Sequence, residues 1–122
     1  MVAGHLISIV DDDPSMREAL VSIIQLLGYD VCAFASAEEF LASGDLGRIT
    51  CAITDIQMPG MNGFELKQQL NLRHGPVPVI MITARAEPDL EEKAKLSGAV
   101  CFLRKPIEVE TLAGCLERAL GT

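Results

Sequence analysis

Aromatic residues are scarce in this sequence, which has no tryptophan, one tyrosine and four phenylalanines among its 122 residues. The core of the folded chain must therefore be built mainly from aliphatic side chains. The chain is nevertheless 49% hydrophobic and 22% charged, a composition that argues against intrinsic disorder. A chain of this length buries roughly two-thirds of the surface that its unfolded form exposes. We therefore expect a single domain over residues 1–122, with its core in residues 5–120.

Basic residues are also few. Ten Lys and Arg residues stand against 17 Asp and Glu residues, so the formal net charge is −7. This charge opposes contact with nucleic-acid phosphates, and we expect no direct binding of DNA or RNA by this chain. Metal cations and basic protein surfaces remain as possible partners.

Long apolar runs are missing. The first run, Leu6–Val10, is short and leads directly into three aspartates, so it is neither a signal peptide nor a membrane span. We expect a cytoplasmic protein that does not associate with a membrane. The sequence also lacks the Gly-x-Gly-x-x-Gly and Gly-Lys-Ser/Thr loops, which argues against a nucleotide-binding fold.

The cysteines form no Cys-x-x-Cys pair, and neither His5 nor His74 completes a zinc pattern. Four cysteines occur, each inside an apolar run: Cys32, Cys51, Cys101 and Cys115. An even number would allow disulfides in a secreted protein. For the reducing compartment expected here, we interpret all four as small buried hydrophobic residues that keep their thiols.

Apolar runs and amphipathic segments alternate along the chain. Five short apolar runs predict strands at residues 6–10, 31–34, 51–54, 79–82 and 100–103. Helix starts are predicted at Asp13-Pro14, at a capping box formed by Ser36 and Glu39, at Asn62 with Glu65, at Glu87-Pro88, and near Val109. Continuous apolar strands joined by helices indicate a parallel sheet covered on both faces, which is a three-layer α/β sandwich.

Polar side chains follow four of the predicted strands. Asp11 and Asp12 come after the first strand, Asp55 after the third, Thr83 after the fourth and Lys105 after the fifth. The carboxyl ends of parallel strands share one edge, and a flavodoxin-like order 2-1-3-4-5 places the first and third strands side by side. Three carboxylates then meet, and a divalent cation such as Mg²⁺ is their natural occupant. Asp13, by contrast, is interpreted as a helix cap.

The same residues resemble a known family, the receiver domain of two-component response regulators, including its stand-alone chemotaxis members. The resemblance spans nearly the whole chain. It depends on four segments in order: Val10-Asp11-Asp12, Asp55 to Gly63, Ile82-Thr83-Ala84, and Lys105-Pro106 with Phe102 three residues earlier.

The resemblance implies a phosphoacceptor site. Asp55 would accept a phosphoryl group from the phosphohistidine of a sensor histidine kinase or a phosphotransfer protein. Asp11, Asp12, the Asp55 carboxylate and the backbone carbonyl of Gln57 would hold Mg²⁺, with Mn²⁺ as a possible substitute. Lys105 would contact the phosphoryl group.

Further roles are implied around that site. Thr83 would move toward the phosphoryl group after transfer, and Phe102 would be the aromatic switch coupled to it. Gln57 and Arg85 would tune the lifetime of the phosphate. The peptide bond between Lys105 and Pro106 would be cis.

The implied activity is that of a signalling switch that promotes its own phosphorylation and dephosphorylation at Asp55, and not that of an enzyme with a separate substrate. The fourth helix, fifth strand and fifth helix would form the partner-binding or homodimerisation surface. A stand-alone regulator and the receiver part of a longer helix-turn-helix transcription factor both remain open. The alternative is a small phosphatase of the haloacid-dehalogenase type, but there the acidic pair comes last and the nucleophile lies in an Asp-x-Asp pair.

Overall fold

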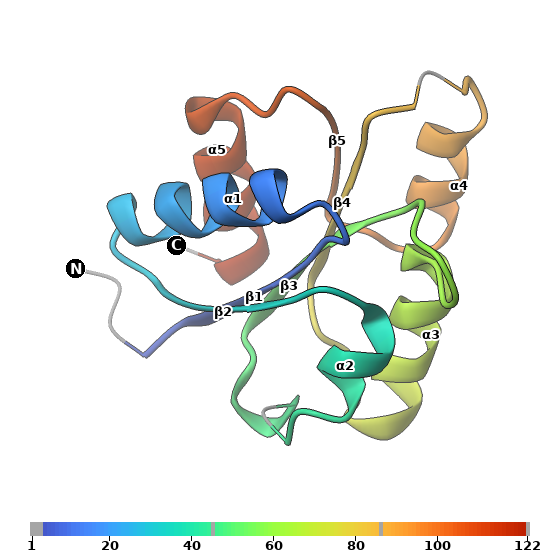
Figure 1. Cartoon of the computed structure of the whole chain (residues 1–122), viewed down its shortest axis with the longest axis horizontal. Coiled ribbons are helices and arrows are strands. Elements are labelled where there is room, and N and C mark those ends of the chain that lie inside the picture. The colour runs from blue at the N-terminus through green and yellow to red at the C-terminus, as the bar shows by residue number, and fades with distance from the viewer. Residues whose placement is uncertain (1–3, 45, 86, 122) are drawn as a thin grey trace.

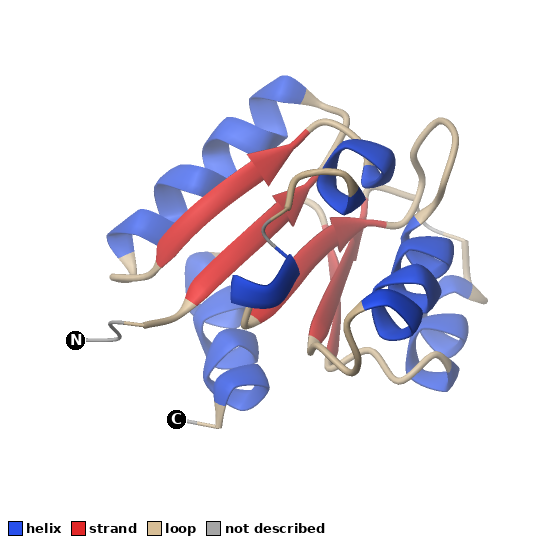
Figure 2. Ribbon diagram, turned by 90° about the horizontal axis from the view of Figure 1, so that it is seen from below, coloured by secondary structure: helices blue, strands red, loops and turns tan. Residues whose placement is uncertain are grey.

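A five-stranded parallel sheet forms the middle of the molecule. In the computed structural model, which describes residues 4–44, 46–85 and 87–121, all strands point the same way (Figure 2). The strands are β1 (Leu6–Val10), β2 (Asp30–Phe34), β3 (Cys51–Asp55), β4 (Val79–Thr83) and β5 (Cys101–Arg104), in the order β2-β1-β3-β4-β5. The predicted flavodoxin-like fold is therefore confirmed.

Helices cover both faces of the sheet. They are α1 (Pro14–Leu26), α2 (Ala37–Leu41), α3 (Gly63–Arg73), α4 (Leu90–Leu96) and α5 (Val109–Leu120), with a short 3₁₀ turn η1 at Leu46–Arg48. Figure 1 shows α1 and α5 on one side of the strands and α2, α3 and α4 on the other. None of the helices in the described ranges is long and apolar enough to cross a membrane.

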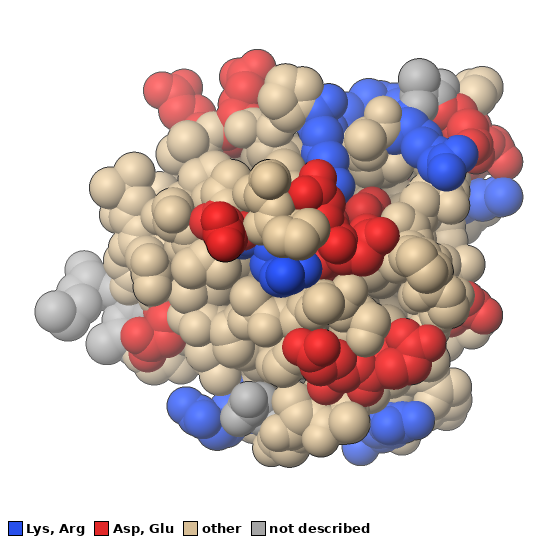
Figure 3. Space-filling view, viewed as in Figure 1, with Lys and Arg blue, Asp and Glu red and all other residues tan. Residues whose placement is uncertain are grey.

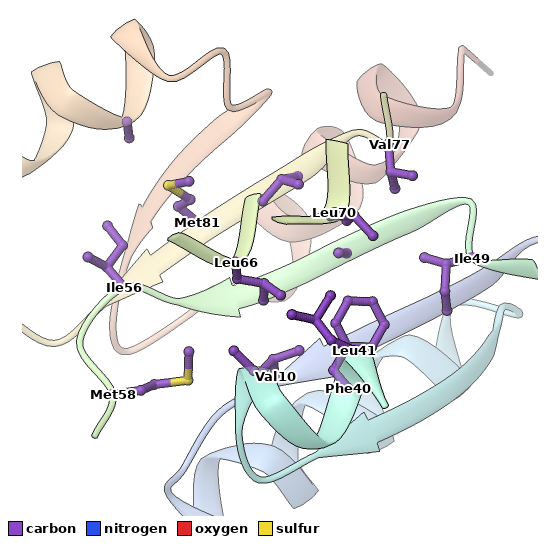
Figure 4. Close-up of a cluster of buried hydrophobic side chains, with 14 of the residues drawn as sticks. Val10, Phe40, Leu41, Ile49, Ile56, Met58, Leu66, Leu70, Val77 and Met81 are labelled. Carbon is purple, nitrogen blue, oxygen red and sulfur yellow. The ribbon is translucent and has the colours of Figure 1, made fainter. Parts of the chain in front are cut away.

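The core consists of two aliphatic layers, one on each face of the sheet. In one layer, Ile7, Ile9 and Ile53 of the strands pack with buried residues of α1 and α5. The other layer packs the opposite sheet face against α2, α3 and α4; its labelled members in Figure 4 are Val10, Phe40, Leu41, Ile49, Ile56, Met58, Leu66, Leu70, Val77 and Met81. Only one phenylalanine, Phe40, is fully buried, so the core is mainly aliphatic as predicted.

Local caps begin three of the helices where the sequence predicts them. The Asp13 carboxylate accepts a hydrogen bond from the Ser15 N–H at 3.0 Å, directly before α1. At α3, Asn62 and Glu65 form a complete capping box, with both reciprocal bonds at 2.9 Å. At α2 the structure shows the Ser36 half of the predicted box, a bond from the Glu39 N–H to Ser36 Oγ at 3.0 Å.

Some predicted boundaries are displaced. Strand β2 begins one residue before the apolar run, at Asp30, and β3 and β4 each end one residue after it, at Asp55 and Thr83. The fourth helix begins at Leu90 and not at Glu87-Pro88, because the chain first makes a turn whose last residue, Asp89, becomes the N-cap. Strand β5 runs from Cys101 to Arg104, one residue later than the apolar run suggests. The reason is that hydrogen bonding to β4 determines where β5 ends. The pairing continues to Thr83 on β4, and its partner on β5 is the polar residue Arg104.

The prediction that all four cysteines keep their thiols is wrong for two of them. Cys101 on β5 and Cys115 on α5 are joined by a disulfide. Cys51 is a buried free thiol, and the Cys32 thiol donates a long hydrogen bond to the Ile7 carbonyl at 3.9 Å. The pairing cannot be read from the sequence because β5 packs on α5 only in the tertiary structure, in the layer that the two residues share.

Candidate functional site

The carboxyl ends of β1, β3 and β4 bring the predicted site residues to one edge of the sheet. Asp11 follows β1 directly, Asp55 is the last residue of β3, and Thr83 is the last residue of β4. The strand order reverses at β1 and β3, which pair with each other in the centre of the sheet. Ligands of open α/β sheets bind in the crevice at such a reversal.

Three carboxylates lie together at this edge. One oxygen each from Asp11, Asp12 and Asp55 can be chosen so that all three lie within 4.8 Å of one another. Asp11 is 0% exposed and Asp55 6% exposed, whereas Asp12 is exposed. Two buried carboxylates in such proximity repel each other in a partly dry environment, so the cluster needs a compensating cation.

Lys105 supplies part of that compensation. Its Nζ lies 3.0 Å from Asp11 Oδ2 and 3.3 Å from Asp55 Oδ2, and its side chain is 15% exposed. The Lys105–Pro106 peptide bond, expected to be cis, is cis in the structure. In Figure 3, acidic and basic side chains lie next to each other near the middle of this face of the molecule.

The oxygens of Asp11 are unequally satisfied. Oδ1 accepts a hydrogen bond from the Asp13 N–H at 3.0 Å. Oδ2 is buried and, although it is in ion-pair contact with Lys105, accepts no hydrogen bond of good geometry from the described residues. The 3.0 Å separation makes Lys105 and Asp11 an ion pair, because a charge contact does not depend on hydrogen-bond angles. An incompletely satisfied carboxylate oxygen beside two others fits a hard divalent cation.

The electrostatic environment shifts the pKa values of two groups. Burial raises the pKa of Asp55 above its ordinary value, and the Asp11 charge adds to this, while Lys105 and the Gln57 N–H oppose it. The Gln57 N–H lies 3.3 Å from Asp55 Oδ1. Burial acts to lower the pKa of Lys105, but its contacts with Asp11 and Asp55 outweigh this and raise the pKa overall. Lys105 is therefore held as a cation between the two carboxylates.

Thr83 is buried at the same edge, and its hydroxyl is engaged locally. Thr83 Oγ1 accepts a hydrogen bond from the Arg85 N–H at 3.0 Å. The Arg85 guanidinium lies 3.7 Å from the Glu87 carboxylate in an exposed ion pair. The hydroxyl thus stabilises the turn after β4 in this state of the molecule.

Phe102 lies on β5, half-buried against the layer formed by α2, α3 and α4. The Arg104 guanidinium lies over its ring, 5.1 Å from the ring centre, and donates a hydrogen bond to the Arg85 carbonyl at 3.0 Å. A single arginine therefore links the turn after Thr83 to the aromatic residue on β5.

Two positioning contacts were not predicted from the sequence. Arg17 Nη1 donates a hydrogen bond to the Asp11 carbonyl at 2.8 Å and so holds the loop after β1 against α1. Glu38 Oε2 accepts a hydrogen bond from the Met61 N–H at 3.1 Å and holds the loop that follows β3. For the first contact the sequence does contain an indication, because Arg17 lies one helical turn after the cap Asp13 and is therefore close to the loop after β1. Nothing local in the sequence indicates the second.

Comparison with known proteins gives a consistent result. The family model described as the response regulator receiver domain matches residues 7–117. The chain belongs to this family. The receiver domain is 33% identical over 117 residues to the transcriptional regulatory protein FixJ of Bradyrhizobium diazoefficiens, covering 96% of this chain and 57% of that protein. It is 36% identical over 117 residues to the response regulator TodT of Pseudomonas putida, covering 96% of this chain and 52% of that protein.

Solved structures agree with these relatives. The chemotaxis protein CheY4 of Vibrio cholerae superimposes with a TM-score of 0.86 at 32% identity, over 97% of this chain and all of that one. This receiver domain spans about half the length of the curated relatives named above. The comparisons do not support a phosphatase of the haloacid-dehalogenase type. The receiver domain is a signalling switch of two-component response regulators.

Proposed function

We propose that Asp55 accepts a phosphoryl group from the phosphohistidine of a sensor histidine kinase or a phosphotransfer protein. The observation that carries the proposal is the arrangement of Lys105 between Asp11 and Asp55, beside an Asp11 oxygen without a well-formed hydrogen bond. This arrangement leaves Asp55 nearly buried and places the Lys105 cation next to it.

In the transfer, an Asp55 carboxylate oxygen forms a bond to phosphorus, and the bond from phosphorus to the donor imidazole nitrogen breaks. The electron pair of that bond returns to the imidazole, which takes up a proton. Such transfers depend mainly on positioning and charge neutralisation. Lys105 is placed to neutralise a phosphoryl oxygen beside Asp55, and the contacts of the Gln57 N–H and Arg17 hold the two loops in place.

Asp11, Asp12, Asp55 and the Gln57 carbonyl would hold Mg²⁺, or Mn²⁺ in its place. When bound, the metal would neutralise charge on the phosphoryl oxygens. The support for this cofactor is the cluster of three carboxylate oxygens within 4.8 Å and the buried Oδ2 of Asp11.

Thr83 and Phe102 would transmit the change. Once Asp55 is phosphorylated, a new acceptor stands at the sheet edge, and the Thr83 hydroxyl would leave the Arg85 N–H to donate to it. Phe102 would then move inward from its half-exposed place under Arg104. Gln57 and Arg85 would set how long the phosphate persists by controlling access of water and promoting or slowing dephosphorylation.

The surface formed by α4, β5 and α5 would carry the output, as a binding site for a partner or for a second copy of the chain. Phe102 and Arg104 of β5 contribute to it, and this would couple it to the phosphorylation site. FixJ and NtrC are named as transcriptional regulators. We extend to this chain their role in transcriptional control, with residues 1–122 as the receiver domain. The proposed location is the cytoplasm, and the receiver domain itself would not contact nucleic acid.

The test is phosphorylation with a small acyl-phosphate donor in the presence of Mg²⁺, followed by intact mass. We expect one added phosphoryl group on the native chain and none on Asp55→Asn. Asp13→Asn is the matched control, since Asp13 caps α1 outside the carboxylate cluster and asparagine caps a helix equally well. Labelling of Asp55→Asn equal to that of the native chain would show that another residue is the acceptor.

A further inference from the structure

The disulfide between Cys101 and Cys115 joins the edge strand of the sheet to the last helix. The two Cα atoms are 6.1 Å apart, a separation that a disulfide spans without movement of the backbone. β5 is the outermost strand on its side and is paired with β4 alone. The bond therefore ties the free edge of the sheet to α5.

Both cysteines line a surface groove of about 280 Å³. Cys101 is 8% and Cys115 4% exposed, and both lie at the wall of this groove, on the surface side of the core. The exposed cation Arg118 follows Cys115 by one helical turn and also lines the groove. A nearby cation favours the reactive thiolate and attracts an anionic oxidant. Lys95 lines the groove too, paired with Glu91 at 3.6 Å.

Cys51 provides an internal contrast. It is fully buried in β3, and burial raises the pKa of its thiol to about 12. Cys51 does not line the groove, and its thiol is protonated at neutral pH. A small oxidant therefore has neither access to this sulfur nor a thiolate to react with.

We propose that Cys101 and Cys115 form a reversible oxidation site whose oxidant is a low-molecular-weight anionic disulfide of the glutathione class. One protein thiolate attacks a sulfur of the oxidant, which gives a mixed disulfide and releases one small thiolate. The second protein thiolate attacks the protein sulfur of that mixed disulfide and releases the second small thiolate. The two protons of the cysteines end on the released thiols, so one small disulfide is reduced as the protein disulfide forms.

Oxidation restrains two of the three elements that carry the proposed output surface. The bond holds α5 on β5 at the residue next to Phe102, whose ring lies in the opposite core layer. The reduced protein has no such tie. This consequence for signalling rests on the proposed function, whereas the oxidation itself does not.

The oxidation site is tested by equilibrating the fully reduced protein with mixtures of oxidised and reduced glutathione, then alkylating and mapping the peptides. As the fraction of oxidised glutathione rises, we expect Cys101 and Cys115 to lose alkylation together, while Cys51 stays reduced. Cys115→Ala should leave Cys101 as a stable mixed disulfide, and Cys101→Ala the reverse. Cys51→Ala is the matched control and should leave the pair unchanged. Alkylation of Cys101 and Cys115 that stays constant as the fraction of oxidised glutathione rises, or pairing of either cysteine with Cys32, would overturn the proposal.

The consequence for signalling is tested separately with the acyl-phosphate donor. Amide resonances of α5 are followed on phosphorylation of the reduced and the oxidised protein. We expect shifts at least two-fold smaller in the oxidised form, and equal shifts would overturn the restraint. Absence of phosphorylation in both forms would instead contradict the proposed function, and the thiol titration would still decide whether the oxidation site exists.

Discussion

Lys105 is the residue on which the charge balance of the site depends. Its Nζ contacts both buried carboxylates, at 3.0 Å from Asp11 and 3.3 Å from Asp55, and offsets the charge of each. Removal of one partner from a buried ion pair is destabilising because it leaves the other charge without compensation. The same residue therefore contributes to folding and to the proposed chemistry, and substitutions at the site separate the two roles.

We expect Lys105→Gln to lower the free energy of unfolding by up to about 3–5 kcal/mol, since two buried carboxylates lose their shared cation. Urea denaturation in the presence of a chelator measures this. The control is Lys93→Gln, which removes an exposed pair with Asp89 at 3.2 Å and should change the stability very little, because solvent screens such a pair. Equal costs for the two substitutions would mean that Lys105 is not compensating buried charge.

Asp55→Asn should raise the free energy of unfolding, which is the opposite of the effect of Lys105→Gln. The size of the increase should depend on pH. The folded-state pKa of Asp55 is raised, mainly by burial, so its contribution to stability is full below the unfolded pKa and is lost as pH rises through the folded pKa. In metal-free buffer, the substituted chain should therefore gain stability relative to the native chain as pH rises above 3.8, the ordinary pKa of an aspartate. Urea unfolding at a series of pH values measures the difference, and a constant difference would contradict a raised pKa.

At the scale of single elements, α3 shows how local sequence places the site. Its N-terminus follows the loop after Asp55, and the Asn62–Glu65 capping box determines where the helix begins. Gly63 is the first helical residue, and a Cβ at this position would lie 2.7 Å from the Asp55 carbonyl. Close approach of helix and strand at this point keeps the loop after β3 short and its residues near the carboxylates.

Substitution of the α3 cap tests this. Asn62→Ala removes the side-chain oxygen that accepts from the Glu65 N–H, while the bond from the Asn62 N–H to Glu65 remains, and it should lower the free energy of unfolding by about 1 kcal/mol. Glu108→Ala is the matched control, because Glu108 is the N-cap of α5 and makes no side-chain cap bond. It should change the stability by less than about 0.5 kcal/mol. Thermal unfolding of both variants beside the native chain provides the comparison.

Helix and strand positions were largely predictable from the sequence because they depend on local patterns. Each strand appears as a short apolar run, and Asp13, Ser36 and Asn62 cap their helices through bonds to residues two or three positions away. The start of α4 was not predictable in this way. Its N-cap, Asp89, makes no cap bond, so no local residue pattern identifies the first turn.

At the scale of the whole molecule, part of the net charge of −7 is concentrated at one point. The three clustered carboxylates come from two loops or strand ends that are far apart in sequence. Bringing them together costs stability in the absence of cations. Binding of a divalent cation should therefore stabilise the folded chain, which is a property of the assembled sheet edge and not of any single segment.

We expect Mg²⁺ to raise the melting temperature of the native chain. At a concentration about 100-fold above its dissociation constant, the stabilisation would be about 2.7 kcal/mol. Asp12→Asn, which changes the exposed member of the cluster, should lose most of this effect, and Asp13→Asn should keep it. Calorimetric scans with and without a chelator measure both. Equal magnesium effects in the two variants would place the ion elsewhere.

The sequence by itself determined the elements, the parallel sheet and the polar residues that meet at its edge. These follow from apolar periodicity, helix caps and the rule that parallel strands end at a common edge. The tertiary structure alone decided the Cys101–Cys115 bond and the contact of Glu38 with the Met61 N–H, which hold together segments separated in the sequence. The physical reason is that such contacts depend on how helices pack against the sheet. A local residue pattern does not indicate which distant segment will pack beside it.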